Sequence, residues 1–290
     1  MRIIDRQGNE YDSADKLQDK LGKMYGSACG RAVMKAVTNP IVSKIGGWAL
    51  STGISAAAVD YYAEKNGIDL FDYETAEYKS FNDFFTRKIK RGRRLIDSDP
   101  SVLVCPSDGK VTAYEIAKSD MFVVKNSVYS VHSLLRDRKL ADRFAGGTAV
   151  IIRLTPDDYH RYIYPCSGLK SRQRKIEGSL HAVRPLINEC VPVYKENSRE
   201  YCLIRSEVFG DVAMIEVGAT MVGRITNYEQ GASPVSKGRE KGRFEFGGST
   251  IILLLGGKVK VCEDILDATK NGCEMKLKLG EAIAVCKQEP

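Results

Sequence analysis

The sequence predicts an α+β fold, in which a mostly-β domain of short antiparallel strands follows a helical N-terminal segment. Residues 13–66 show apolar side chains at helical spacing, without sustained alternation. From about residue 101 the chain changes to short apolar or alternating runs bounded by Gly, Asp or Pro, which is typical of strands. The length of 290 residues is enough for one or two domains with a buried core and no disulfide staples.

The helical segment is assigned to residues 1–66, and the β-rich domain to residues 67–290. Between Lys20 and Trp48 the segment carries five basic residues and no acidic residue. Small residues dominate the stretch 46–58. Two interpretations remain open. One is an interfacial helix pair on an anionic membrane surface; the other is an ordinary helical hairpin that packs on the core and exposes a solvated basic face.

A connector spans residues 68–100. Ser80, followed three residues later by Asp83, resembles a capping box and predicts a short helix that begins near Phe81. The run 87–94 is strongly basic, so nucleic acid, phosphate head groups and a solvated loop are alternatives for it. No nucleic-acid-binding motif accompanies this run, and we predict no nucleic-acid partner.

The β-rich domain is predicted from six short runs and one turn. Phe209-Gly210-Asp211 joins two of the runs as a hairpin. Short helices are expected only at 131–136 and 141–144. The predicted strands cover 101–105, 148–154, 201–208, 212–217, 250–255 and 258–262.

Composition argues against several classes of protein. The longest aliphatic run, 251–255, is far shorter than the ~20 residues that span a bilayer, and residues 1–8 lack the apolar region of a secretory signal. The eight cysteines have no CxxC spacing, which favours reduced thiols over a zinc or redox site. Histidine occurs only as His132, His160 and His181, without HxH or HExxH spacing, so no metal site is predicted.

Three segments carry residues suited to chemistry. They are Pro106-Ser-Asp-Gly-Lys110, Leu154-Thr-Pro-Asp-Asp-Tyr-His-Arg161 and Phe246-Gly-Gly-Ser-Thr250. Glycines before Ser249 permit unusual backbone angles and close approach, and a serine held in such a turn can attack the preceding carbonyl. Each segment alone is common in loops, so the argument rests on their combination.

In combination, these segments resemble the phosphatidylserine decarboxylases, pyruvoyl enzymes that are made as proenzymes. Gly248-Ser249-Thr250 matches the cleavage motif of that family. The resemblance covers most of the chain. It is carried by residues 81–87, 95–97, 106–109, 158–161, 216–225 and 241–250.

The resemblance implies self-cleavage between Gly248 and Ser249 into a β chain and an α chain that stay together. Ser249 would become a pyruvoyl group, form a Schiff base with the amine of phosphatidylserine and release phosphatidylethanolamine after loss of CO₂. A histidine would act as the cleavage base, oriented by Asp108. The resemblance also implies a homodimer and a peripheral location on the cytoplasmic face of the cell membrane, where the basic helical segment would dock.

One departure from the family pattern concerns the base. Many members carry a second histidine, in the pattern Tyr-His-Arg-x-His, and it usually serves in self-cleavage. Here the second position is Ile163, which cannot transfer protons. Three alternatives follow: His160 does both tasks, His181 supplies the base from elsewhere in the fold, or the chain matures slowly or not at all.

Two rival functions remain at this stage. A pyruvoyl decarboxylase of a free amino acid would share the cleavage chemistry and differ only in its pocket. A non-catalytic β module like a biotinyl or lipoyl carrier is suggested by Met275-Lys276-Leu277. However, this segment lacks the full carrier consensus, and a Gly-Gly-Ser-Thr sequence would serve no purpose in a carrier.

Overall fold

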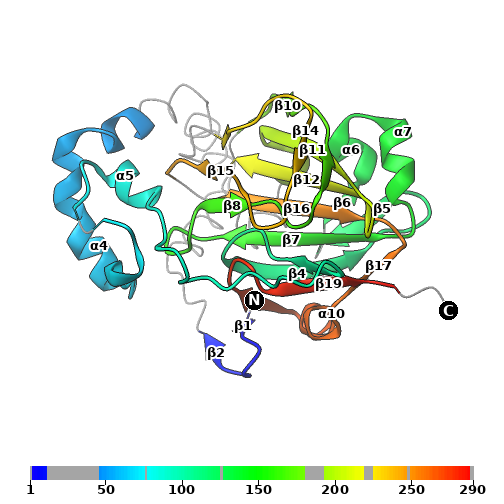
Figure 1. Ribbon diagram of the computed structural model, residues 1–290, viewed down its shortest axis with the longest axis horizontal. Coiled ribbons are helices and arrows are strands. Elements are labelled where there is room, and N and C mark those ends of the chain that lie inside the picture. Colours follow the sequence, from blue (N-terminus) through cyan, green and yellow to red (C-terminus); the bar gives the residue numbers. More distant parts are fainter. Residues whose placement is uncertain are drawn as a thin grey trace, which may run out of the picture.

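Strands dominate the computed structural model, which describes residues 2–11, 46–75, 77–124, 127–179, 193–218, 225–246 and 249–287. Within these residues the largest sheet has eleven strands, in the order β14-β9-β11-β12-β16-β7-β4-β18-β1-β2, with β10 paired to β11 (Figure 1). Its strands are β1 (Arg2–Ile4), β2 (Glu10–Tyr11), β4 (Gly109–Glu115), β7 (Thr148–Leu154), β9 (Gly168–Lys170), β10 (Arg174–Ile176), β11 (Arg199–Ser206), β12 (Gly210–Gly218), β14 (Ser233–Val235), β16 (Ser249–Leu255) and β18 (Cys273–Leu277).

Smaller sheets flank this large one. One has the order β13-β15-β8, another the order β17-β19-β3, and β5 and β6 form a hairpin. Their strands are β8 (Arg161–Ile163), β13 (Ile225–Asn227), β15 (Glu240–Phe244), β3 (Val102–Val104), β17 (Val259–Val261), β19 (Ala282–Cys286), β5 (Met121–Val124) and β6 (Ser127–Ser130). Neighbouring strands are antiparallel except for β1 and β18, so the predicted fold class is confirmed.

The helices are short and lie around the sheets. A helical lobe formed by residues 46–72 and α5 stands at one end of the molecule, and α6 and α7 stand at the other end (Figure 1). No helix within the described ranges is long and apolar enough to cross a membrane. Besides residues 46–50, the helices are η1 (Gly53–Ala58), α4 (Val59–Lys65), η2 (Leu70–Asp72), α5 (Phe81–Phe85), α6 (Val131–Leu135), α7 (Arg138–Ala141), η3 (Asp142–Phe144), α9 (Val193–Glu196) and α10 (Glu263–Lys270).

The centre of the large sheet is the most apolar part of the chain. All seven residues of β16 are buried, and β16 pairs with β12 on one side and β7 on the other. Both faces of β16 are covered, so the run Ile251–Leu255 needs no polar alternation. The predicted hairpin is confirmed, because Ser206 and Gly210 close the ladder between β11 and β12, with Gly210 at a φ of 70°.

Several features differ from the sequence prediction, among them the strands β4, β18 and β19, which were not expected. Residues 2–4, placed in the helical segment, form β1 and extend the sheet beside β18, with Ile3 buried. Helix α10 was not expected; its N-cap is Cys262, whose side chain makes no capping hydrogen bond, so the usual start signal is absent. Residues 12–45, the basic part of the predicted helical segment, lie outside the described residues, and the limits 1–66 and 67–290 stay a prediction.

Candidate active site

Ser249 is the first residue of β16, at the centre of the large sheet. Its backbone lies between Leu154 of β7 and Gly218 of β12. The side chain is fully buried, and its Oγ has no hydrogen-bond partner among the described residues. A buried hydroxyl without a partner is costly, which makes it a candidate for a functional group.

His160 lies directly before β8, and its carbonyl accepts a hydrogen bond from the N–H of Phe244 on β15. The imidazole is fully buried, and its Nδ1 is 2.9 Å from the carbonyl oxygen of Asp158. A carbonyl can only accept, so Nδ1 carries the proton and Nε2 keeps a free lone pair. Nε2 has no hydrogen-bond partner within the described ranges.

The aromatic side chain of Phe85 connects this histidine to the segment that precedes Ser249. Its ring centroid lies 3.9 Å from that of His160 and 5.0 Å from that of Phe246. The N–H of Phe246 also donates to Asn82 Oδ1 at 3.1 Å. Helix α5, whose N-cap Ser80 accepts from the N–H of Asp83 as predicted, therefore fixes both the histidine and the approach to the cleavage motif.

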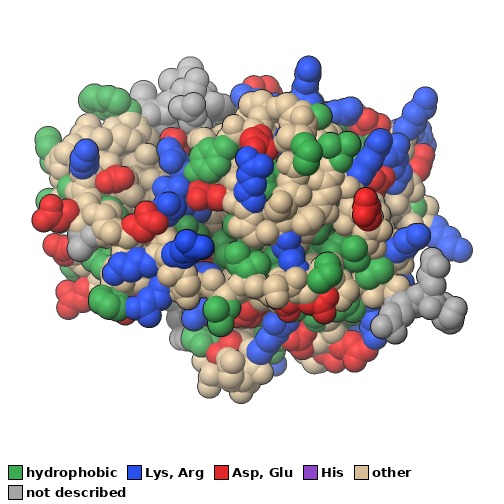
Figure 2. All heavy atoms as spheres, in the orientation of Figure 1, with side chains coloured by type: hydrophobic (Ala, Val, Ile, Leu, Met, Phe, Trp, Pro, Cys, Tyr) green, Lys and Arg blue, Asp and Glu red, His purple; other side chains and the backbone are tan. Residues whose placement is uncertain are grey.

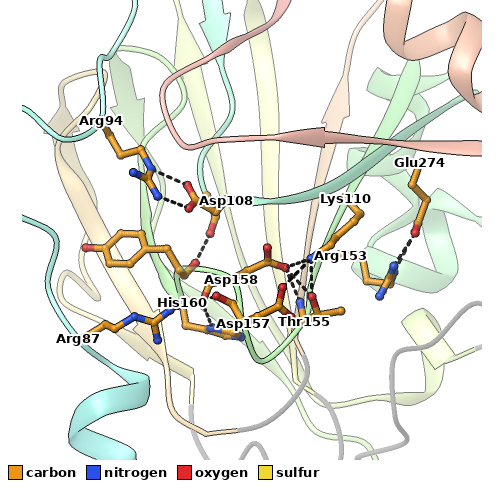
Figure 3. Close-up of polar contacts among 12 residues, drawn as sticks. Arg87, Arg94, Asp108, Lys110, Arg153, Thr155, Asp157, Asp158, His160 and Glu274 are labelled. Carbon is orange, nitrogen blue, oxygen red and sulfur yellow. Dashed lines mark hydrogen bonds and ion pairs between the residues drawn. The ribbon is translucent and has the colours of Figure 1, made fainter. Parts of the chain in front are cut away.

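A buried ion pair holds the loop that carries His160 (Figure 3). Lys110 Nζ donates to Asp158 Oδ2 at 2.7 Å, and the N–H and hydroxyl of Thr155 donate to the same oxygen. Burial alone would raise the pKa of Asp158, but the Lys110 ammonium and these hydrogen bonds lower it below its usual value. Arg87 Nη2 also holds this loop, because it donates hydrogen bonds to the backbone carbonyls of Asp157 and Asp158.

Burial also decides the protonation state of His160. Desolvation lowers its pKa to about 3, although the nearby Asp158 carboxylate acts in the opposite direction. The imidazole is therefore neutral near pH 7, the state in which Nε2 accepts a proton.

The Asp108 carboxylate is bound away from this histidine (Figure 3). Arg94 donates to it through Nε at 3.1 Å and Nη2 at 2.6 Å, and the N–H of Leu279 donates at 2.8 Å. Ile163, the position of the second family histidine, packs with Leu279 in a small apolar cluster. The structure thus brings His160 close to the segment before Ser249 but gives Asp108 hydrogen bonds to Arg94 and Leu279 and none to His160.

Two further predicted residues, His181 and Gly248, lie outside the described residues. His132 is exposed on α6. Sequence reasoning missed Lys110, Arg94 and Phe85. Lys110 ends a segment that the sequence analysis singled out, and Phe85 lies inside a family motif, so both carried a signal. Arg94 was counted only as one charge in a basic run.

A model of the family described as phosphatidylserine decarboxylase matches residues 81–285. The chain belongs to the phosphatidylserine decarboxylase family. Phosphatidylserine decarboxylase proenzyme 2 of Clostridium acetobutylicum is 42% identical over 262 residues, covering 90% of this chain and 89% of that protein. The phosphatidylserine decarboxylase proenzyme of Ruminiclostridium cellulolyticum is 39% identical, covering 99% and 98%. The corresponding proenzyme of Fusobacterium nucleatum is 39% identical, covering 97% and 96%. The predictions of the family and of a decarboxylase enzyme are confirmed.

In this phosphatidylserine decarboxylase family member, His160 should make stability depend on pH. The unfolded histidine has a pKa near 6.5. Below that pH the histidine of the unfolded chain is protonated, whereas the histidine of the folded chain stays neutral down to about pH 3. The free energy of unfolding therefore falls as the pH is lowered. The Ser249→Ala variant stays one chain and is used as the parent. When the pH is lowered from 7.5 to 5, the free energy of unfolding of this parent should fall by about 2 kcal/mol more than that of the same protein with His160→Leu.

Urea unfolding at the two pH values measures this difference. His132→Leu, at the exposed histidine of α6, is the control variant. Equal pH dependence of the parent and the His160→Leu variant would contradict the argument.

The Arg94–Asp108 pair should contribute to folding. Arg94→Met removes a bidentate charged contact from a pair whose side chains are each 12% exposed. We expect a loss of about 2 kcal/mol in the free energy of unfolding, measured by urea denaturation. Lys88→Met, at an ion pair with both side chains about half exposed, is the matched control and should cost less than about 1 kcal/mol. A loss at Arg94 no larger than that of the control would refute this.

Proposed function

We propose that this chain cleaves itself between Gly248 and Ser249 and then decarboxylates phosphatidylserine to phosphatidylethanolamine with the pyruvoyl group so formed. The names of its relatives, phosphatidylserine decarboxylase proenzymes, support both the substrate and a processed precursor. The single observation that carries the proposal is a pair of buried atoms. Ser249 Oγ and His160 Nε2 are both buried, and both lack a hydrogen-bond partner among the described residues.

Cleavage begins at the Ser249 hydroxyl. Nε2 of His160 takes its proton, and Oγ attacks the carbonyl carbon of Gly248, so that the peptide C–N bond breaks and an ester forms. Loss of the α-proton of Ser249 then expels the Gly248 carboxylate and leaves dehydroalanine. Tautomerisation and attack by water release ammonia and leave the pyruvoyl group at the start of the α chain.

The residues around Ser249 fit such a group. Its backbone is fixed by strands on both sides, and the ring of Phe246, held by Phe81 and Phe85, lies three residues before it. The pyruvoyl group supplies an electron sink for the carbanion left by CO₂. His160, held through Nδ1 by the carbonyl of Asp158, is the candidate for returning to that carbon a proton that its Nε2 first takes from the ammonium group of the substrate.

Intact mass measurement of the purified protein tests the proposal. The parent should give two chains that divide at Gly248/Ser249, with the small chain lighter by one ammonia than its serine-initiated peptide. Ser249→Ala should remain one chain of 32.1 kDa. An uncleaved parent would refute self-cleavage and favour an arrested proenzyme. CO₂ release from phosphatidylserine micelles, compared with release from free serine, separates the lipid enzyme from a free amino-acid decarboxylase.

Peripheral binding to the cytoplasmic face of a membrane is part of this proposal, and so is a homodimer. The helical lobe supports the first part, because it exposes several large apolar side chains. Trp48 is 72% exposed, Ile54 89%, Tyr61 67% and Phe71 65%. Aromatic and aliphatic side chains of this kind enter the boundary between lipid head groups and acyl chains.

Substitution within the lobe should weaken membrane binding. Burial of one large apolar side chain contributes about 2 kcal/mol, so Ile54→Ser should lower partitioning onto phosphatidylserine-containing vesicles at least about tenfold in co-sedimentation. Val123→Ser, at a half-exposed residue of the β5–β6 hairpin, is the control and should bind as the parent does. Equal binding of the two variants would argue against docking through the lobe.

A further inference from the structure

A cavity of about 270 Å³ lies between the basic connector and β8. The connector contributes residues between Lys88 and Ile96, and β8 contributes all three of its residues. Ile89, Ile163 and Leu279 give the cavity apolar walls. In Figure 1 the connector is the cyan chain that runs from the helical lobe across the sheets.

The cavity is separate from the candidate active site. Arg161 and Ile163 line it, whereas His160 is not among its lining residues. The His160 ring instead lies against Phe85 of α5. The cavity is therefore not used by the chemistry proposed for Ser249.

Positive charge exceeds negative charge around this cavity. Among the described residues that line it, the cations are Lys88, Lys90, Arg91, Arg94 and Arg161, and the carboxylate is Glu240. Figure 2 shows Lys and Arg side chains gathered where the helical lobe meets the sheets.

Three of these cations are already paired with carboxylates. Lys88 contacts Glu74 at 3.1 Å, Arg94 contacts Asp108 at 2.6 Å, and Arg161 contacts Glu240 at 2.8 Å.

The remaining two cations, Lys90 and Arg91, have no carboxylate within ion-pair distance in the described part of the chain. Lys90 Nζ donates to the neutral carbonyl of Phe71 at 2.7 Å and lies 4.3 Å from the centroid of the Phe71 ring. An ammonium has three N–H donors, so donors remain for a ligand oxygen. Arg91 is exposed at the cavity. A guanidinium beside an ammonium is suited to a phosphate oxygen cluster, because arginine binds phosphate in a bidentate manner and lysine binds it as a point charge.

We propose that the connector cavity is a second binding site, which takes a phosphate ester through Lys90 and Arg91 and packs its carbon part against the isoleucine and leucine walls. The volume is just below the range of pockets for drug-sized ligands, so it suits a head group or a small ester and excludes a whole phospholipid. Two sources share this chemistry: the head group of an anionic lipid and a free phosphate ester.

The test compares two doubly substituted proteins that lose the same charge. Lys90→Gln/Arg91→Gln changes the cavity. Lys118→Gln/Lys139→Gln removes two exposed cations elsewhere, one of them on α7 at the far end of the molecule, and is the control. Both are studied as purified full-length proteins, and circular dichroism verifies that they are folded.

The first arm measures binding of sn-glycerol 3-phosphate by calorimetry. The second arm measures co-sedimentation with phosphatidylcholine vesicles with and without phosphatidic acid. We expect the cavity variant, but not the control, to lose at least about tenfold in affinity in one arm. Loss in the first arm assigns the site to a free ester, and loss only in the second assigns it to a lipid head group. Equal affinities of the two variants in both arms, or no binding by the parent, would overturn the proposal without affecting the cleavage experiment.

Discussion

Replacement of His160 by glutamine should slow cleavage after Gly248 by about 10²- to 10⁴-fold, the usual contribution of a general base. A serine hydroxyl is a weak nucleophile and needs a proton acceptor, and Nε2 of His160 is buried without a partner among the described residues. The burial that keeps the imidazole neutral also makes its protonation costly, which the nearby Asp158 carboxylate partly offsets. The rate is measured by following the two chains after expression, in parallel with the parent.

Two variants make this experiment decisive. His132→Ala changes an exposed histidine on α6 and should leave the rate unchanged. His181→Ala tests the other candidate base. Cleavage of His160→Gln at the parental rate, together with arrest of His181→Ala, would transfer the role to His181. Parental rates in all three variants would exclude a histidine base altogether.

Substitution of Lys241 by methionine should cost about 3–5 kcal/mol in the free energy of unfolding. Its ammonium lies 2.9 Å from Glu216, and the two side chains are 1% and 0% exposed. Lys241 also donates to Asn227 Oδ1, and Gln173 donates to the other oxygen of Glu216. Burial raises the pKa of Glu216 although Lys241 acts against it, so the carboxylate depends on this cation. Removal of the lysine leaves a buried carboxylate whose remaining hydrogen-bond partners among the described residues are the amides of Gln173 and Asn227.

Urea unfolding in the Ser249→Ala background measures this effect on one intact chain. Lys175→Met, at an exposed pair with Glu177, is the control and should cost less than about 1 kcal/mol. The double variant Lys241→Met/Glu216→Leu should recover most of the loss, because an apolar pair needs no desolvation of charge. A cost at Lys241 no greater than that at Lys175 would refute the argument.

The fold class and several strands follow from local signals. The run 148–154 was bounded correctly because its apolar side chains stop at Pro156 and Asp157, and the hairpin at Gly210 depends on a turn that only a few residues can form. β1 is an exception, because its three residues form a strand only by pairing with β18, which lies some 270 residues later in the chain. A short stretch of sequence cannot predict this strand, because the strand forms only by pairing with a distant part of the chain.

The sequence predicted which residues belong to the site better than it predicted which of them contact one another. The family motifs named Asp158, His160 and Ser249, and α5 carries another motif, but no motif says that the ring of Phe85 lies against both His160 and Phe246. Glu216 and Lys241 were likewise quoted only as parts of motifs. They meet beside Asn227 of β13, which pairs with β15, because the Asn227 side chain contacts both of them. Similarly, the pairing of Asp108 with Arg94 depends on the path of the connector.

The position of β16 has a consequence for the supply of active enzyme. β16 lies between β12 and β7, and β18 lies between β4 and β1, so residues after Ser249 pass twice between strands from before Gly248. After the proposed cleavage, the α chain could leave only if five ladders opened together with the core that they bury: those of β16 with β12 and β7, of β18 with β4 and β1, and of β19 with β3. A reactive group at residue 249 would therefore stay with its own molecule and could not be exchanged as a dissociable cofactor is. Once such a group were damaged, activity would return only through synthesis of new chains.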